Sequence, residues 1–216
     1  MTPNSATTLH QLPTSLDLAA MAVAGAFAAH VARKRQLPLF GVLLAGVVGG
    51  LGGGILRDVL LGLEPAAITT WYYIPVVLAA AVVGGLTARR THFSRLPFVA
   101  TQAIAIGLLI GIGVQKAVEY RTPAPAAIFL GVVTATFGGA VDDVLTGRKA
   151  VVMADDHLLL GSVLFGAVVF WALTIYVAFA AAVVATVILV TGLRVLSVHF
   201  GWTSPVFPGD DAPSPP

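Results

Sequence analysis

Long apolar stretches, separated by short polar or basic segments, make up most of this 216-residue chain. A helix needs about 20 apolar residues to cross a hydrocarbon core about 30 Å thick. Seven stretches have roughly this length, and they cover residues 16–32, 38–61, 72–88, 96–118, 126–145, 158–177 and 179–198. The pattern predicts an all-α integral membrane protein with seven transmembrane helices. Only total length separates the last two, because apolar residues continue across Ala178.

Composition agrees with this pattern and narrows the function. The chain is 57% hydrophobic and 10% charged, and its mean hydropathy of +0.93 is far above that of a soluble domain. A formal net charge of +2 is too small to indicate nucleic-acid binding. The chain has no cysteine and its five histidines are isolated, so we expect no resident metal and no cofactor. No nucleophile stands near a base in the sequence, and we therefore do not expect an enzyme.

Basic residues indicate how the helices are oriented. Asp17 begins the first apolar stretch and basic residues follow it, which reverses the polarity of a signal peptide, so we expect a retained first helix. With seven spans, most basic residues fall on the side of the C-terminus: Arg33, Lys34, Arg35, Arg89, Arg90, Arg95, Arg148, Lys149 and Arg194. The positive-inside rule then predicts a plasma-membrane protein with its N-terminus outside and its C-terminus in the cytoplasm.

The remaining segments complete the predicted organisation. Residues 1–14 are polar and predict a flexible leader, residues 15–200 form the transmembrane domain, and residues 201–216 are rich in Pro, Ser, Gly and Asp and predict a disordered tail. Trp71, Tyr72 and Tyr73 begin the third stretch, where an interfacial aromatic belt is expected.

Two similar strings interrupt the apolar pattern. They are GGGILRDVLLG, which begins at Gly52, and GGAVDDVLTG, which begins at Gly138. The step along the chain from Gly53 to Gly138 equals the step from Pro38 to Pro123, and we call this step the repeat offset. The strings and their common offset therefore indicate an internal duplication.

The predicted repeat has three helices in each copy. Its first copy covers about residues 15–93, its second about 94–178, and a seventh helix at about 179–199 lies outside the symmetry. Because three is an odd number, the second copy enters the membrane upside down relative to the first. Inverted repeats of this kind are common in channels and transporters, where two broken helices meet near the membrane centre and build a site.

The glycines of the two strings allow two interpretations. Small residues four apart let membrane helices pack closely, whereas adjacent glycines let a helix bend or unwind and free carbonyl oxygens for a cation. The recurrence of the string favours the second interpretation, although a bent pore helix must also pack. The predicted pore-lining and bending residues are Gly52, Gly53, Gly54, Gly138 and Gly139.

Charged residues follow both glycine groups. Arg57 and Asp58 point about 100° apart on a helix, so we expect them to pair with neighbouring helices rather than with each other. Asp142 and Asp143 occupy the equivalent positions. Either all four lie at helix ends among the headgroups, or the acids draw cations into a pore and Arg57 pairs with one of them, because an unpaired charge at depth is costly.

Three further polar residues have both structural and functional interpretations. Lys116, near the end of the fourth stretch, either reaches the interface along its aliphatic stem or acts as a gate or voltage-sensing charge. Thr134 and Thr136 precede the second glycine pair. Their hydroxyls either contribute oxygen atoms to a cation path or bond back to the preceding helical turn.

At these residues the chain resembles the trimeric intracellular cation (TRIC) channel family in its prokaryotic branch, which is also classed as a glycine-transporter domain. The resemblance covers residues 16–202 and rests on both strings and on the Gly-x-Gln-Lys-Ala pattern from Gly113 to Ala117. It implies a seven-helix protomer, a homotrimer in membrane lipid, and a pore in each protomer lined by the second and fifth helices, which bend at their glycines. Such proteins pass monovalent cations, especially K⁺, so permeating K⁺ or Na⁺ and bound lipid are the expected ligands.

The chain departs from the family at Asp142, where an arginine is usual. This exchange should make the second site more acidic, and we expect Asp142→Arg to lower cation conductance or alter rectification. Unchanged single-channel currents would count against a pore position. The alternative function is a secondary transporter for a small amino acid such as glycine, for which inverted repeats are equally natural. A purely structural scaffold would leave the charges in the apolar stretches without a role.

Overall fold

The computed structural model describes residues 14–89, 95–147 and 158–202, and these ranges are helical without a strand. Each predicted apolar stretch corresponds to one helix, with ends that agree within four residues. One short additional helix, α3, was not predicted. The helices are α1 (Thr14–Lys34), α2 (Leu39–Leu60), α3 (Ala66–Thr69), α4 (Tyr73–Thr87), α5 (Arg95–Glu119), α6 (Ala124–Leu145), α7 (Leu159–Leu173) and α8 (Phe179–Phe200).

The separation of the last two helices is confirmed. The chain turns after α7, and Ala178 has an extended backbone with φ −61° and ψ 144° before α8 begins. Most of the predicted leader and tail, residues 1–13 and 203–216, lies outside the described residues. The same holds for Arg90, Arg148 and Lys149, on which part of the topology prediction depends.

The chain is a multi-pass helical membrane protein. Among the described helices, α1, α2, α5, α6 and α8 are long and apolar enough to cross a membrane. Helices α4 and α7 are equally apolar but have only 15 residues each, which is fewer than the roughly 20 that a straight crossing needs. Five spans are therefore evident from length and composition, and the count of seven stays a prediction.

The outer surface has the composition that lipid favours. Large apolar side chains point outward on several helices and turns, and Phe40, Trp71 and Tyr176 are each more than 80% exposed. Charged side chains are buried in the interior instead, among them Arg57 and Asp58. This arrangement is the reverse of a soluble domain, and it places the costly groups where protein atoms can satisfy them.

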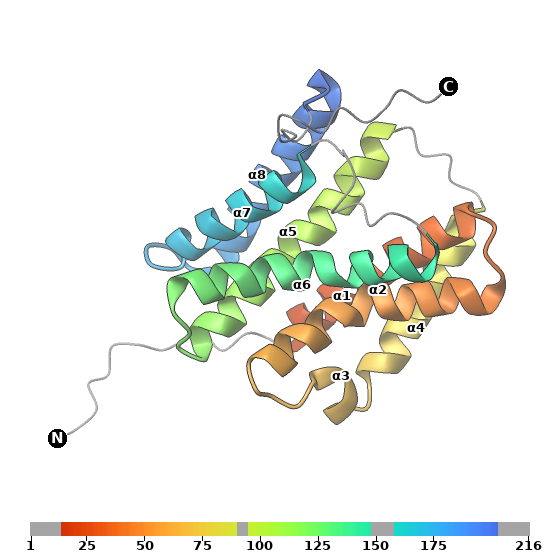
Figure 1. Ribbon diagram of the computed structural model, residues 1–216, viewed down its shortest axis with the longest axis horizontal. Coiled ribbons are helices and arrows are strands. Elements are labelled where there is room, and N and C mark those ends of the chain that lie inside the picture. The colour runs from red at the N-terminus through yellow and green to blue at the C-terminus, as the bar shows by residue number, and fades with distance from the viewer. Residues whose placement is uncertain (1–13, 90–94, 148–157, 203–216) are drawn as a thin grey trace, which may run out of the picture.

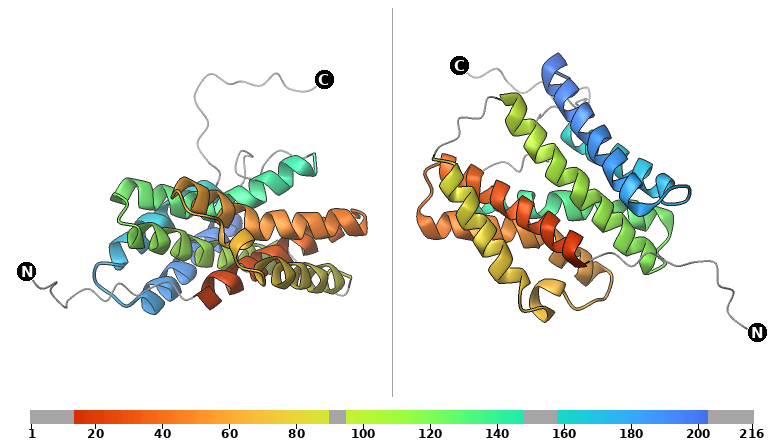
Figure 2. Two further views of the ribbon diagram at one scale, coloured as in Figure 1. Left: turned by 90° about the horizontal axis from the view of Figure 1, so that it is seen from below. Right: turned by 180° about the vertical axis from the view of Figure 1, so that it is seen from behind.

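The helices form two groups that meet along α2 and α6 (Figure 1). Helices α1, α2 and α4 contact one another, and α5, α6 and α7 do the same. Helix α8 lies beside α5 and α7, on the side away from α4 (Figure 2). The two groups thus have matching internal contacts, and α8 belongs to neither triple.

Helices α2 and α6 cross with their backbones in close contact. A Cβ atom on Gly53 would meet the carbonyl oxygen of Thr134, and one on Gly138 would lie 2.7 Å from the carbonyl oxygen of Gly49. The partner position on α6 rises as the position on α2 falls, so the two helices are antiparallel. As a result, the C-terminal end of α2 and the C-terminal end of α6 lie at opposite ends of the pair.

Candidate functional site

The C-terminal end of α2 holds a buried ion-pair network centred on Arg57. This side chain is fully buried, with 0% of its surface exposed. Its Nη1 donates to Asp17 Oδ1 on α1 at 3.1 Å, and its Nε donates to Asp58 Oδ1 at 2.8 Å. Two carboxylates therefore surround one guanidinium, the kind of pairing that a buried charge requires.

Three further groups complete this network. Lys116 Nζ on α5 donates to Asp58 Oδ1 at 2.8 Å, and the hydroxyl of Tyr73 on α4 donates to Asp17 Oδ2 at 2.9 Å. The backbone amide of Ala66, the first residue of α3, donates to Asp58 Oδ2 at 3.1 Å. We call Asp17, Arg57, Asp58, Tyr73 and Lys116 the α2 cluster. It has two positive and two negative charges, so it is neutral.

Two expectations change at this cluster. Arg57 and Asp58 were expected to pair with neighbouring helices rather than with each other, but they do both. The arginine side chain is long enough to fold back to its neighbour with Nε while Nη1 reaches Asp17. Tyr73 was expected in an interfacial aromatic belt, and the structure buries it and bonds it to Asp17. Trp71, two residues earlier in the chain, is exposed.

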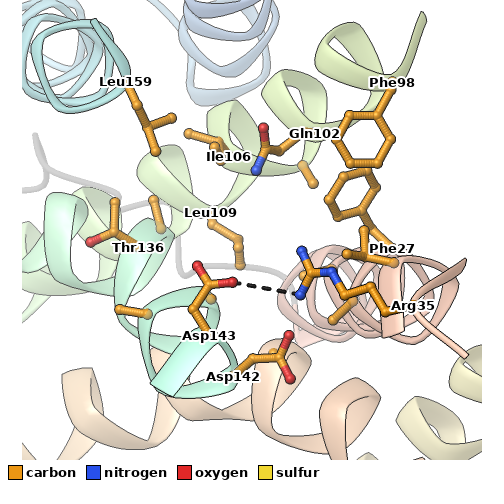
Figure 3. Close-up of a pocket in the computed structure, with 18 residues that line it drawn as sticks. Phe27, Arg35, Phe98, Gln102, Ile106, Leu109, Thr136, Asp142, Asp143 and Leu159 are labelled. Carbon is orange, nitrogen blue, oxygen red and sulfur yellow. Dashed lines mark ion pairs between the residues drawn. The ribbon is translucent and has the colours of Figure 1, made fainter. Parts of the chain in front are cut away.

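The C-terminal end of α6 is built differently. Asp142 and Asp143 are also buried, with exposed fractions of 6% and 7%. Arg35, just after α1, brings its Nη1 to 3.8 Å from Asp143 Oδ1, which is too long for a hydrogen bond. Within the described ranges, Asp142 Oδ1 has no hydrogen-bond partner. Figure 3 shows the carboxyl group of Asp143 beside Arg35 and that of Asp142 lower in the view.

A cavity of about 260 Å³ lies beside this acidic pair (Figure 3). Its walls come from α1, α5 and α6, with Gly49 of α2 and Leu159 of α7. The rings of Phe27 and Phe98, with centroids 5.0 Å apart, form part of the apolar wall. The polar lining residues are Arg35, Gln102, Thr136, Asp142 and Asp143. We call this space the acidic cavity.

Comparison with known proteins assigns the family. A family model described as glycine transporter matches residues 14–89 and 99–175. The chain belongs to this glycine transporter family. The step between the first residues of the two matched segments, 14 and 99, equals the repeat offset between Gly53 and Gly138.

Relatives of this glycine transporter family member are bacterial membrane proteins. A UPF0126 membrane protein of Vibrio cholerae is 32% identical over 154 residues, which cover 69% of this chain and 62% of that protein. The UPF0126 inner membrane protein YadS of Escherichia coli is 33% identical over 137 residues, covering 60% and 64%. YvgT of Bacillus subtilis is 28% identical over 205 residues, covering 90% and 95%. The chain thus spans less than two thirds of the first two relatives.

Solved structures of TRIC channels share the fold. The TRIC trimeric intracellular cation channel orthologue from Rhodobacter sphaeroides superposes with a TM-score of 0.78 at 27% identity, over 87% of this chain and 97% of that one. Another TRIC cation channel has a TM-score of 0.76 at 22% identity, over 89% of this chain and 96% of that one. The resemblance drawn from the glycine strings is confirmed at the level of family and fold.

Four of the predicted glycines in this family member are packed closely against other atoms, and one is open. Gly52, Gly53 and Gly138 lie in the α2–α6 contact, and Gly54 lies against the side chain of Met21. Gly139 is open and lines the acidic cavity. Both α2 and α6 remain continuous helix through their glycines, so close packing is the role that the structure shows directly.

One of the two predicted threonines is packed in the helix contact, and the other lies at the acidic cavity. Thr134 is buried against Gly53 and Gly113, and its hydroxyl donates to the carbonyl oxygen of Leu130 at 2.6 Å. Thr136 donates to the carbonyl oxygen of Val132 at 2.8 Å, but it also lines the acidic cavity. Bonding to the preceding turn therefore occurs in both, and only Thr136 adds an oxygen atom to the cavity wall.

Sequence reasoning missed at least four residues of these sites, one of which is Tyr73, assigned only to an aromatic belt. Asp17 and Arg35 were used only as signs of topology, and Gln102 was not considered. The repeat offset contains a signal for two of them, because it relates Asp17 to Gln102 just as it relates Arg57 to Asp142. The Asp17–Arg57 pair of the α2 cluster thus corresponds to a neutral residue, Gln102, and an acidic residue, Asp142, at the acidic cavity.

Proposed function

We propose that this chain is a cation channel, with a path for monovalent cations such as K⁺ between α1, α2, α5 and α6. The observation that carries the proposal is the acidic cavity, where two buried carboxylates line a space of about 260 Å³ beside the crossing of α2 and α6. Buried acids that line a cavity favour cations and disfavour anions. The fold shared with the TRIC channel orthologue from Rhodobacter sphaeroides supports the same activity.

The α2 cluster closes the proposed path at its other end. Lys116 places a positive charge 2.8 Å from Asp58, and a cation that approached this point would be repelled. Opening would require Lys116 to leave Asp58, while Arg57 keeps the carboxylate paired. Moving one such charge through the membrane field is worth about 2.3 kcal/mol per 100 mV, so we expect the open probability to depend on voltage.

We propose that the two helix triples are inverted repeats and that α4, α7 and α8 also cross the membrane, giving seven spans. The antiparallel crossing of α2 and α6, the matching contacts within each triple and the two family-model segments support this arrangement. The basic residues around Arg33 and Arg35 then face the cytoplasm, which puts the N-terminus outside. We also propose that α2 and α6 bend at their glycines when the path opens, because their backbones touch there.

A homotrimer in membrane lipid is the proposed assembly. The related channel from Rhodobacter sphaeroides is trimeric, and this chain exposes large apolar side chains such as Phe40 and Phe165 that lipid or other protomers can cover. Cross-linking of the protein in native membrane vesicles tests the assembly. Bands up to a trimer are expected, and a ladder that stops at the monomer or dimer would contradict it.

Planar bilayer recording of the purified protein tests the channel directly. We expect unitary currents that reverse near the K⁺ equilibrium potential in a KCl gradient. Currents that reverse near the chloride potential would contradict cation selectivity. A matched Asp142→Arg protein should pass smaller or rectifying currents, because the exchange adds positive charge to the cavity.

A secondary transporter for a small amino acid such as glycine is the second candidate. The glycine transporter description of the family favours it, and so does the difference between the two ends of the α2–α6 pair, one filled by ion pairs and one bordered by a cavity, since transporters expose a site to one side at a time. Liposome uptake separates the two functions. Saturable uptake of glycine that depends on a proton or sodium gradient, without unitary currents, would replace the channel by a transporter.

A further inference from the structure

We propose that the acidic cavity holds a monovalent metal cation against the carboxylate of Asp142. The charges on its walls are not balanced. Among the described residues that line the cavity, Asp142 and Asp143 are negative and Arg35 alone is positive. The α2 cluster, in contrast, balances two acids with Arg57 and Lys116. These described residues therefore leave one negative charge unbalanced.

The largest charge difference between the two ends maps onto position 142, and a smaller one onto Val31 of the cavity wall, which is equivalent to Lys116. The repeat offset relates Arg57 to Asp142 and Asp17 to Gln102. In the α2 cluster the guanidinium of Arg57 fills the space between α1 and α2 and bonds to Asp17. At the other end the shorter Asp142 lines the acidic cavity, whose walls come from α1, α5 and α6. A cation in this cavity takes the place that the guanidinium occupies in the first repeat.

Asp142 itself supplies the second observation. It is more than nine-tenths buried, it lines the cavity, and its Oδ1 has no hydrogen-bond partner in the described chain. A buried carboxylate oxygen without a partner is costly, and Figure 3 shows that its neighbour Asp143 is the one that Arg35 approaches. Asp142 is thus the carboxylate left for a ligand.

The charge and the size of the cavity indicate which cation fits. One monovalent ion brings the three wall charges to zero, whereas a divalent ion would leave an excess positive charge next to Arg35. A cavity of about 260 Å³ leaves room for an ion together with several waters. Thr136 donates its hydroxyl hydrogen to Val132, so its oxygen lone pairs remain available to the ion or its waters.

A role for this site in conduction rests on the proposed channel function. Cation binding does not, because it can be measured without any current. We suggest following thermal unfolding of the detergent-solubilised protein while KCl replaces N-methyl-D-glucamine chloride at constant ionic strength. A ligand that binds only the folded state raises the melting temperature in a saturable way. We expect a rise of about 2 °C or more, and the same series with NaCl and MgCl₂ measures preference.

Two variants and one control make this test specific. Asp142→Asn should lose the dependence on K⁺. The control Glu64→Gln removes one negative charge at an exposed site away from the cavity and should keep it. The double variant Gln102→Asp with Asp142→Arg copies the Asp17–Arg57 pair into the second repeat. It should be as stable without K⁺ as the natural protein is with K⁺, and it should no longer respond to K⁺.

Several results would overturn the site. One is a K⁺ response that persists in Asp142→Asn or in the double variant, and another is a stronger response to Mg²⁺ than to K⁺. A third is stabilisation by acid with none by K⁺, which would mean that a proton neutralises Asp142. Failure of the channel proposal looks different. If the protein binds K⁺ at Asp142 but passes no unitary current, the binding site is supported and the channel proposal fails. If it passes unitary currents but shows no K⁺ response that depends on Asp142, the channel is supported and the binding site fails.

Discussion

The C-terminal ends of α2 and α6 carry acidic residues at equivalent positions, but one end is filled with ion pairs and the other borders a cavity. At α2, the Arg57 side chain occupies the space between Asp17 and Asp58 and bonds to both. At α6, Asp142 and Gln102 line an open space of about 260 Å³. The comparison teaches that an arginine and an aspartate fill one end with their ion pair, whereas the aspartate and glutamine at the equivalent positions border a cavity.

The difference has a direct energetic meaning. A buried guanidinium between two carboxylates ties α1 to α2, and Tyr73 and Lys116 extend the network to α4 and α5. The contact between the acidic pair and Arg35 is longer, at 3.8 Å. We therefore expect the α2 cluster to serve mainly stability and closure, and the acidic cavity to serve ion binding.

Removing the central arginine is the strongest test of this comparison. Arg57→Met leaves the buried carboxylates of Asp17 and Asp58 without their common partner, and breaking a buried pair in this way costs about 3–5 kcal/mol. Thermal or denaturant unfolding in detergent measures the loss. Asp142→Asn, at the equivalent position, should change stability by less than about 1 kcal/mol. Equal losses in the two variants would contradict the distinction between the two ends.

The crossing of α2 and α6 gives the next largest effect. Gly53→Ala places a methyl group against the carbonyl oxygen of Thr134, and the backbones must separate to admit it. Overpacking of this kind costs about 1–3 kcal/mol, which unfolding measurements in detergent would detect. We also expect altered single-channel currents, because the crossing lies beside the proposed path. Unchanged stability would show that the two backbones are not held in contact.

Lys116 tests closure rather than stability. Its side chain is 17% exposed, and Asp58 keeps Arg57 and the backbone amide of Ala66 as partners when the lysine is lost, so we expect a smaller loss of stability than for Arg57→Met. Lys116→Gln removes the positive charge from the proposed path while Arg57 still holds Asp58. We expect a higher open probability and a weaker voltage dependence in bilayer recordings. The same currents in both proteins would mean that Lys116 does not close the path.

Gly139 gives the smallest effect and completes the comparison of glycines. An added Cβ at this position meets no atom within 4 Å, because the residue faces the acidic cavity. Gly139→Ala should therefore fold normally and gain up to about 1 kcal/mol of helix stability. Comparing its melting temperature with that of Gly53→Ala shows whether glycine is needed where α2 and α6 touch, where it lines the acidic cavity, or at both positions. A destabilised Gly139→Ala would indicate that α6 must flex at this point.

The helices were the easiest part of the fold to predict. A membrane helix is long and apolar along its whole length, so its signal is local, and each predicted stretch matched a helix. The short helix α3 between Pro65 and Thr70 lacked such a signal. The spans of α4 and α7 remain predictions because each has only 15 residues.

The candidate site was only partly predictable. The two strings singled out Arg57, Asp58, Asp142 and Asp143, all of which lie in the α2 cluster or at the acidic cavity. The partners were not accessible, because Asp17 is 40 residues from Arg57 and Tyr73 is 56 residues from Asp17. Such contacts depend on how neighbouring helices rotate and cross, which no local pattern records.

The sequence by itself determined the membrane-embedded helical class, the positions of the long helices, the repeat offset and the unequal charges at positions 57 and 142. These features are local in composition or visible as a repeated string. Only the tertiary structure decided that α2 and α6 cross antiparallel, that Arg57 satisfies two acids, and that Asp142 Oδ1 lacks a partner among the described residues around its cavity. The reason is physical, since the cost of a buried charge depends on the groups that packing brings within hydrogen-bonding distance.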